Sequence, residues 1–177
     1  MRRNPALFIS LLVLLVASAG CVELLDRQIR IPLTFSTESE FVLPPTQETG
    51  YNELSVDVIP SDFLDFLSEN EVDLSNIENA TIGEVSLEIL TPGITFNILS
   101  DVKVEVELDG QRITLGSLDV AGEEVTEVTI PISGQADVIA LLDQSSFKVF
   151  LSGTLEEPIE TEVLIKARID YDLKVLI

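Results

Sequence analysis

The sequence predicts an all-β domain, an antiparallel β-sandwich of about eight to ten strands with one or two short helices. Apolar and polar residues alternate over many short runs, which is the period of a half-buried strand. Turn residues such as Asp109-Gly110 join neighbouring runs at hairpin spacing. The last run is apolar at every odd position from Val163 to Ile177, and so long a strand must bend or pass between two sheets. A β-barrel is the second choice of fold.

The first residues have the pattern of an export signal. Met1-Arg2-Arg3 supplies a short positively charged region, residues 6–16 are continuously apolar, and residues 17–20 are small. The apolar run is too short for a membrane-spanning helix, which needs about 20 apolar residues. We therefore expect this segment to be removed rather than to span a membrane.

The segment Ser18-Ala19-Gly20-Cys21 resembles the lipobox of bacterial lipoproteins, and Cys21 is the only cysteine of the chain. The resemblance implies cleavage between Gly20 and Cys21 and fatty-acyl chains such as palmitate on Cys21, which would hold the protein at the cell envelope. Val22 stands where an aspartate is associated with inner-membrane retention, so the resemblance favours the outer membrane. It ends at Cys21, because residues 22–177 carry no motif that identifies a family.

The chain is accordingly predicted to divide into three parts. Residues 1–20 are the signal peptide, residues 21–26 are the lipidated cysteine with a short tether, and residues 27–177 form a single β-sandwich domain. The first predicted strand begins soon after Cys21, so the tether spans at most about 30 Å even when extended. We expect the domain to lie close to its membrane.

Strands are predicted wherever apolar residues recur at every second position. These runs cover residues 29–35, 41–43, 54–58, 84–89, 102–108, 113–115, 128–132, 147–151 and 163–177. Pro44-Pro45 ends the second run, and Pro131 marks the seventh as an edge strand, because proline cannot donate to a sheet. Residues 72–77 are ambiguous between a turn and a short strand, and residues 153–158 are predicted to form a loop.

Two short helices are predicted between strands. The first follows Pro60, with Ser61 as the N-cap and Asp62 in the first turn, where a carboxylate complements the helix dipole. Its apolar face consists of Phe63, Phe66 and Leu67. The apolar face of the second helix consists of Val138, Leu141 and Leu142.

The clearest hairpin connects residues 102–108 with residues 111–115. Asp109-Gly110 fits a type I′ turn, and a two-residue loop fixes the register of both strands. On the outer face this register sets Glu107 opposite Arg112, an opposite-charge pair that contributes about 0.2 to 1 kcal/mol. The other predicted pairs are Leu108 with Gln111, Val106 with Ile113, and Val104 with Leu115.

The composition restricts the chemistry and the partners of the protein. The chain has 31 acidic and 10 basic residues, a net charge of −21, and no histidine. An acidic field repels nucleic acid, so no nucleic-acid partner is expected. Without histidine the chain lacks the usual general base and every imidazole triad, and its lysines occupy outward strand positions. We predict no enzymatic activity and no cofactor; the acidity is equally compatible with cation binding, a basic partner or a saline habitat.

A weak set of calcium candidates consists of Glu123, Glu124, Asp170 and Asp172, because Ca²⁺ prefers oxygen ligands. Their spacing matches no EF-hand. We interpret them as solvated surface acids and predict no metal site.

Two functional hypotheses remain. The first is a membrane-anchored cell-envelope lipoprotein with a non-enzymatic structural or protein-interaction role, which presents an edge such as residues 41–43 or 128–132 to another envelope protein. The alternative is a carrier that holds an apolar ligand between its sheets. It is suggested by Phe150, Leu164 and Leu176, which lie on the nominally wet face. An apolar cavity of several hundred Å³ would favour the carrier, and a solid core would exclude it.

Overall fold

The computed structural model describes residues 29–134 and 136–177, which form eight strands and two short α-helices. The strands are β1 (Arg30–Leu43), β2 (Gly50–Pro60), β3 (Ile77–Ile89), β4 (Leu99–Leu108), β5 (Gln111–Asp119), β6 (Glu127–Ile130), β7 (Ser146–Leu155) and β8 (Val163–Leu176). The helices are α2 (Phe63–Glu69) and α3 (Val138–Leu142), with 3₁₀ turns at Leu74–Asn76 and Phe96–Ile98.

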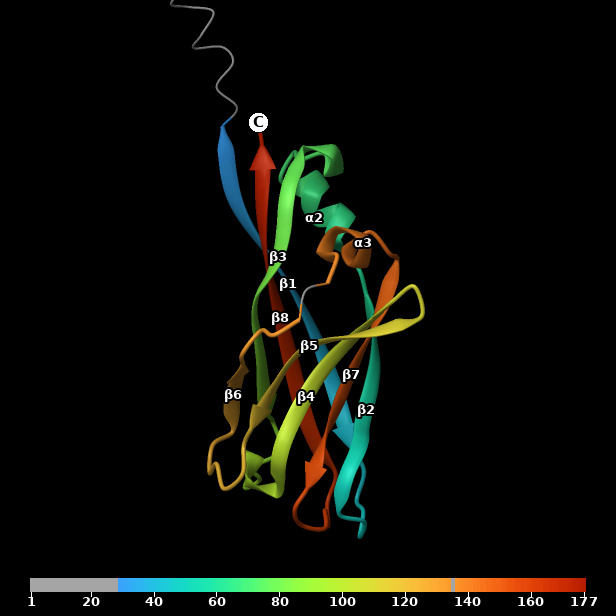
Figure 1. The fold of residues 1–177 in the computed structure, drawn as a ribbon, viewed down its shortest axis with the longest axis vertical. Coiled ribbons are helices and arrows are strands. Elements are labelled where there is room, and N and C mark those ends of the chain that lie inside the picture. Colours follow the sequence, from blue (N-terminus) through green and yellow to red (C-terminus); the bar gives the residue numbers. More distant parts are fainter. Residues whose placement is uncertain (1–28, 135) are drawn as a thin grey trace, which may run out of the picture.

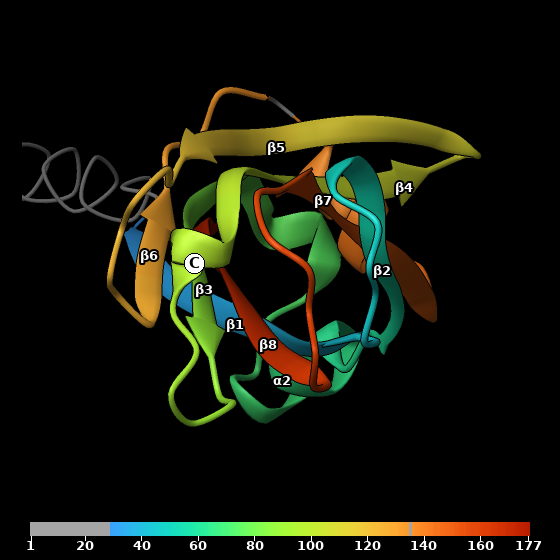
Figure 2. The same cartoon turned by 90° about the horizontal axis from the view of Figure 1, so that it is seen from below.

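The strands lie in two four-stranded sheets that face each other (Figures 1 and 2). The strand orders are β1-β8-β3-β6 and β2-β7-β4-β5. All pairs are antiparallel, and the hairpins are nested: β4 pairs with β5, β3 with β6, β2 with β7, and β1 with β8. This order is that of a jelly roll. The predicted antiparallel β-sandwich is therefore confirmed, with two open sheets in place of a barrel.

Strand β8 is the centre of the first sheet, as its length predicts. It pairs with β1 from end to end on one side and with β3 on the other. Its odd-numbered residues from Val163 to Val175 are no more than 1% exposed, whereas Ile177, just beyond the strand, is 69% exposed. The apolar alternation in the sequence thus corresponds to one face of β8, which is buried along the whole length of the sandwich.

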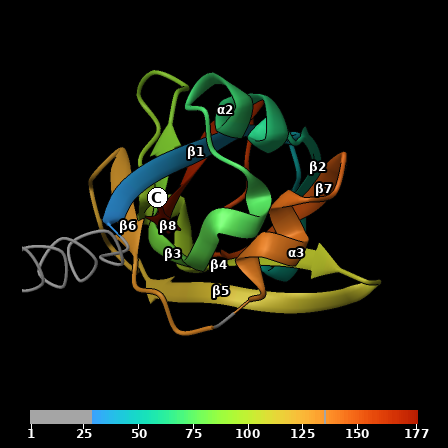
Figure 3. The ribbon, with the colours of Figure 1, turned by 90° about the horizontal axis from the view of Figure 1, so that it is seen from above.

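The core fills the space between the sheets, and both helices close one end of it (Figure 3). Phe41, Leu87 and Leu151 are fully buried. At the closed end, Phe35 of β1 packs against Phe63 and Phe66 of α2, with ring centres 5.4 and 5.1 Å apart. The amphipathic face predicted for the first helix is thereby confirmed as a cover over the core.

The two strands predicted at residues 29–35 and 41–43 are one continuous strand, β1. Thr37 and Ser39 interrupt the apolar pattern, yet they are buried at 5% and 4% exposure and keep the inward period of Phe35 and Phe41. The prediction was wrong because polar side chains occupy two inward positions. Thr37 Oγ1 lies 3.3 Å from the hydroxyl of Tyr171, whereas Ser39 Oγ has no partner among the described residues.

Strand β2 presents a different face from the one its apolar residues predict. A bulge between Glu53 and Ser55 shifts the register, so Val56 and Val58 are 40% and 54% exposed while Ile59 is buried. A bulge adds one residue to one strand, which turns every later side chain to the opposite face.

Several other boundaries differ from the predicted ones. Strand β3 begins at Ile77 rather than at residue 84, and β7 continues through residue 153, where a loop was predicted. The ambiguous residues 72–77 contain a 3₁₀ turn at Leu74–Asn76. Strand β6 stops at Ile130, ahead of Pro131.

The central hairpin follows the predicted register up to its fourth pair. Leu108 opposes Gln111, Glu107 opposes Arg112, and Val106 opposes Ile113. A bulge between Val104 and Glu105 then places Val104 opposite Gly116, so the predicted pairing of Val104 with Leu115 is wrong. Both Val104 and Leu115 nevertheless face the core and are fully buried.

The helix caps also differ in one position. Asp62, not Ser61, is the N-cap of α2, and its side chain makes no capping bond. Ser61 Oγ instead donates to the carbonyl oxygen of Leu142 at 2.6 Å, which ties the start of α2 to the end of α3. In α3, Asp137 caps the helix by accepting from the amide of Ala140 at 3.0 Å.

Candidate functional site

The predicted cleavage and lipidation residues, Gly20 and Cys21, lie outside the described residues. The described chain starts at Ile29. Its amide donates to the carbonyl of Ile177 at 3.1 Å, and its carbonyl accepts from the amide of Ile177 at 3.0 Å. Within residues 29–134 and 136–177, no helix is long and apolar enough to cross a membrane.

The lysines lie at outward strand positions, as predicted. Lys148 pairs with Glu107 and Lys166 with Glu38, both at 2.8 Å. Tyr51 and then Glu105 raise the pKa of Lys103, whose ammonium lies 3.2 Å from the Glu105 carboxylate. A nucleophilic lysine needs a lowered pKa, so the environment of Lys103 is the opposite of a catalytic one.

The four calcium candidates occupy separate places. Glu123 and Glu124 are exposed in the turn between β5 and β6, and Asp170 and Asp172 lie on the outer face of β8. In the part of the chain that the structure describes, no group of three or more acidic or cysteine side chains is arranged to hold a metal ion.

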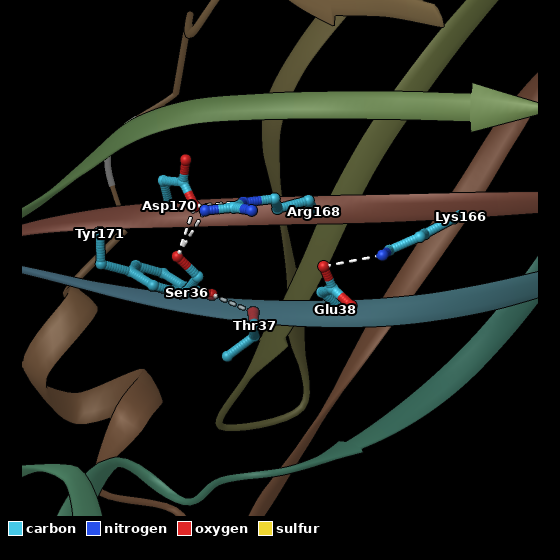
Figure 4. A network of polar contacts seen from close by, with 7 residues as sticks. All are labelled: Ser36, Thr37, Glu38, Lys166, Arg168, Asp170 and Tyr171. Carbon is cyan, nitrogen blue, oxygen red and sulfur yellow. Dashed lines mark hydrogen bonds and ion pairs between the residues drawn. The ribbon is translucent and has the colours of Figure 1, made fainter. Parts of the chain in front are cut away.

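Asp170 belongs to a polar network between β1 and β8 (Figure 4). Its carboxylate accepts from Ser36 Oγ at 2.6 Å and from Arg168 Nε at 2.8 Å. Partial burial favours the protonated acid, but the bonds from Ser36 and Arg168 outweigh it and lower the pKa of Asp170. The network therefore joins two neighbouring strands and leaves this carboxylate occupied.

Phe150 lies on the outer face of the second sheet, and its cover comes from its own sheet. The guanidinium carbon of Arg112 is 3.7 Å from the ring centre, and Phe150 is only 3% exposed. The same guanidinium donates to Glu53 of β2 at 2.5 Å. The predicted pair between Arg112 and Glu107 is not formed, because Arg112 reaches over Phe150 to another strand.

An open sheet edge is the most distinctive feature of the surface. Strand β3 pairs with β8 along its whole length, but with β6 only from Val85 to Glu88. Sequence reasoning missed this edge, because residues 77–83 mix exposed polar and half-buried apolar positions and lack clean alternation. Pro131 was the available signal, since it predicts that β6 stops pairing at that point.

Beyond Pro131 the chain leaves β3 and crosses to the second sheet. Ile132 pairs with Gly116 of β5, and the amides of Ser133 and Gly134 both donate to the carbonyl of Leu115 at 2.9 and 3.1 Å. A Cβ atom on Gly134 would overlap the carbonyl oxygen of Thr114, so only glycine permits this close approach. The crossing leaves the first half of β3 without a second neighbouring strand among the described residues.

The space between this edge and the crossing segment is a groove with a volume of about 690 Å³. It is lined by Glu78, Asn79, Ala80, Thr81 and Ile82 of β3 and by residues 132–134 and 136–139. Ala80 and Ile82 oppose Leu173 and Tyr171 of β8, so their side chains share the inward face of the sheet. No strand of the second sheet lines the groove, which places it at the flank of the sandwich.

Comparison with known proteins gives similarity of fold alone. No protein-family model matches the sequence, and no curated protein matches it. The structure is similar to the capsid of Helicobacter pylori bacteriophage KHP30, with 18% identity, a TM-score of 0.38, and 84% of this chain and 97% of that chain covered. It is also similar to the capsid of cyanophage Pam1, with 10% identity, a TM-score of 0.39, and 80% and 86% covered. At these identities and TM-scores the similarity says nothing about what this chain does.

Proposed function

We propose that the protein is a lipid-anchored component of the bacterial cell envelope with a non-enzymatic, protein-interaction role. The observation that carries the anchor is the sequence Ser18-Ala19-Gly20-Cys21, which follows an apolar run and holds the only cysteine of the chain. Several acyl chains on one cysteine give stable membrane attachment, because each buried methylene contributes about 0.8 kcal/mol. Val22 favours the outer membrane as the destination.

The described domain supports an interaction role by what its surface offers. Its lysines Lys103, Lys148 and Lys166 are held in ion pairs, and Asp170 is bonded within the sheet. The open edge of β3 and its groove, in contrast, expose backbone and apolar groups that suit another polypeptide.

The anchor is tested by metabolic labelling of the full chain with a palmitate analogue in a bacterial host. We expect the wild-type chain to incorporate label, to lose residues 1–20 and to sediment with membranes, and Cys21→Ser to do none of these. The double variant Cys21→Ser/Glu157→Cys is the matched control, because it keeps one thiol but moves it to an exposed loop. Label on the double variant, or membrane attachment of Cys21→Ser, would contradict the proposal.

The interaction role is tested by crosslinking in cells. A photoreactive residue at Thr81, in the open edge, is compared with one at Val58, which is exposed on the second sheet. We expect a reproducible crosslinked protein from Thr81 and its loss when Cys21→Ser removes the anchor. The absence of any reproducible partner from Thr81 would rule out an interaction through this edge.

The carrier alternative receives less support from the packing. The inward residues of both sheets are almost fully buried, with Leu87, Val104 and Leu151 at 0% exposure. Leu164 and Leu176, two of the residues that suggested it, are half-buried at the surface. Mass spectrometry of lipids that copurify with the chain separates the two functions, since only a carrier would retain a stoichiometric apolar ligand.

A further inference from the structure

We propose that the open edge of β3 receives an extended basic peptide of another protein, which adds a strand to the first sheet at residues 78–83. This rests on the interaction role proposed above and deepens it by naming the kind of partner. Its test uses the purified chain and does not involve the lipid anchor, so a failure of peptide binding can be told apart from a failure of the anchor.

Among the described residues, the backbone of this edge has hydrogen-bonding groups without a partner strand. Antiparallel pairing with β8 occupies one side of β3, and pairing with β6 on the other side begins only at Val85. Apart from the β8 ladder, no backbone hydrogen bond from a described turn or loop reaches residues 78–83. An exposed row of amides and carbonyls is the template for strand addition, because the added strand satisfies them directly.

The groove beside the edge fits the inward side chains of such a strand. Alternate residues of a strand point to opposite faces, so every second peptide side chain would enter the groove. There it would meet the half-buried Ala80 and Ile82 on one side and Ile132, Val138 and Ile139 on the other. These contacts are apolar, so we expect small aliphatic residues at the inward positions of the peptide.

The outward face of the same edge is acidic at the end near Gly83. Glu84 is exposed there, and the carboxylate of Asp172 leans over Gly83, occupying the space that a side chain would fill. At the other end of the edge, Glu78 pairs with Arg30 at 2.7 Å, and Lys174 of β8 stands opposite Asn79. Together with the net charge of −21, the carboxylates near Gly83 favour lysine or arginine at the outward peptide positions beside residues 81–84.

A second copy of the chain is a poorer occupant because of the shape of the edge. The bulges in β3 at Ile77/Asn79 and Ile82/Glu84 oppose pairing between two identical edges, since both irregular strands would have to match each other. A separate extended peptide has no such bulges, and the net charge of −21 favours a basic one. The observations therefore favour a basic partner over self-association.

The first experiment measures binding of the purified full chain, in detergent micelles, to a labelled peptide of about eight residues in which valine alternates with lysine. We expect saturable binding of this peptide. A peptide with glutamate in place of lysine should bind at least about tenfold more weakly, because its carboxylates would be repelled by Glu84 and Asp172. N-methylation of alternate peptide amides should weaken binding by a similar factor, because it blocks one hydrogen-bonding edge. Equal binding of all three peptides, or no binding, would overturn the proposal.

The second experiment locates the peptide. Hydrogen exchange of the amides that face the open edge within residues 78–83 should slow by about tenfold or more when the peptide is bound, with no change in the edge strand β2. Asp172→Asn should weaken binding by up to about fivefold, whereas Glu157→Gln, which removes an exposed carboxylate from a distant loop, should not. Protection elsewhere, or protection that appears without peptide at high protein concentration, would refute the basic partner, the latter in favour of a second copy.

Discussion

Arg112 shows how one long side chain determines the environment of several residues. Its guanidinium covers Phe150 on a face of the sheet that would otherwise be wet, and it bonds Glu53 across the intervening strands. Glu107 stands directly opposite Arg112 in the hairpin, yet it pairs with Lys148. The ring of Phe150 therefore explains the orientation of the Arg112 side chain. In this orientation the guanidinium stacks on the ring and also reaches the carboxylate of Glu53.

A double-mutant cycle tests this choice of partner. We expect Arg112→Ala and Glu53→Ala to couple by about 0.2 to 1 kcal/mol, the range of exposed ion pairs, in urea denaturation. The matched cycle of Arg112→Ala with Glu107→Ala should give a coupling near zero. Equal couplings in the two cycles would show that Arg112 divides its contacts between both acids.

Tyr171 is a second residue whose role is set by burial. It is fully buried in β8, and removal from water strongly raises the pKa of its hydroxyl, against the opposing effect of the bond with Thr37. In the unfolded chain a tyrosine ionises near pH 10. Above that pH the unfolded state loses a proton that the folded state keeps, so the free energy of unfolding falls as the pH rises.

We expect this loss of stability to depend on Tyr171. Between about pH 9 and pH 11 the free energy of unfolding of the wild type should fall more steeply than that of Tyr171→Phe. At neutral pH Tyr171→Phe should cost about 0.5 to 1.5 kcal/mol through the lost bond to Thr37. Parallel pH profiles for the two proteins would contradict the assignment.

At the scale of elements, bulges decide which face a strand presents. The bulge after Glu53 turns Val56 and Val58 to the solvent, and the bulge at Val104 moves Gly116 into register. Gly116 then accommodates the close approach of Pro131, which allows the chain to cross from the first sheet to the second. One added residue in a strand thus contributes to opening the groove beside β3.

The hairpin between β4 and β5 depends on two residues with positive φ, Asp109 at 52° and Gly110 at 75°. We expect Gly110→Ala to cost about 1 kcal/mol, because alanine is strained in this conformation. No atom lies within 4 Å of the added methyl, so steric overlap does not contribute. Asp109→Asn should be nearly neutral, since asparagine tolerates a positive φ. Thermal or urea unfolding measures both, and equal costs would disprove the turn assignment.

At the scale of the whole molecule, the nested hairpins join the two ends of the described domain. Strand β1 pairs with β8 from Arg30 with Leu176 to Leu43 with Val163, so the outermost pair closes almost the entire domain. Such pairing has a high contact order, and domains of this kind fold in about milliseconds to seconds. The net charge of −21 opposes the same closure through repulsion across the surface.

Added salt should therefore stabilise the domain. We expect the Tm to rise by several degrees between about 10 mM and 300 mM NaCl, since screening weakens repulsion between exposed carboxylates. Choline chloride should give the same rise. Calcium chloride at matched ionic strength should add nothing further if Glu123, Glu124, Asp170 and Asp172 are solvated acids. A larger shift with Ca²⁺ would instead reveal a cation site.

The groove could be predicted from the sequence only in part. Pro131 predicted an edge, and β6 ends there. The open edge itself could not be predicted, because Glu78 to Gly83 form a bulged, half-exposed strand whose inward residues are limited to Ala80 and Ile82. Which residues lie across from them depends on the crossing to β5, a contact between distant parts of the chain.

The sequence alone determined the local properties of this protein: the two-residue period of its strands, the type I′ hairpin, the two amphipathic helices and the buried face of β8. These follow from forces within a few residues, namely side-chain alternation and turn conformation. The anchor at Cys21 stays a prediction of the same kind. Only the tertiary structure decided that β1 is one strand, that the sandwich is a jelly roll, and that β3 keeps an open edge. Alternation of apolar and polar residues indicates that a strand is buried on one face. Which strand pairs with it depends on the packing of the complete core.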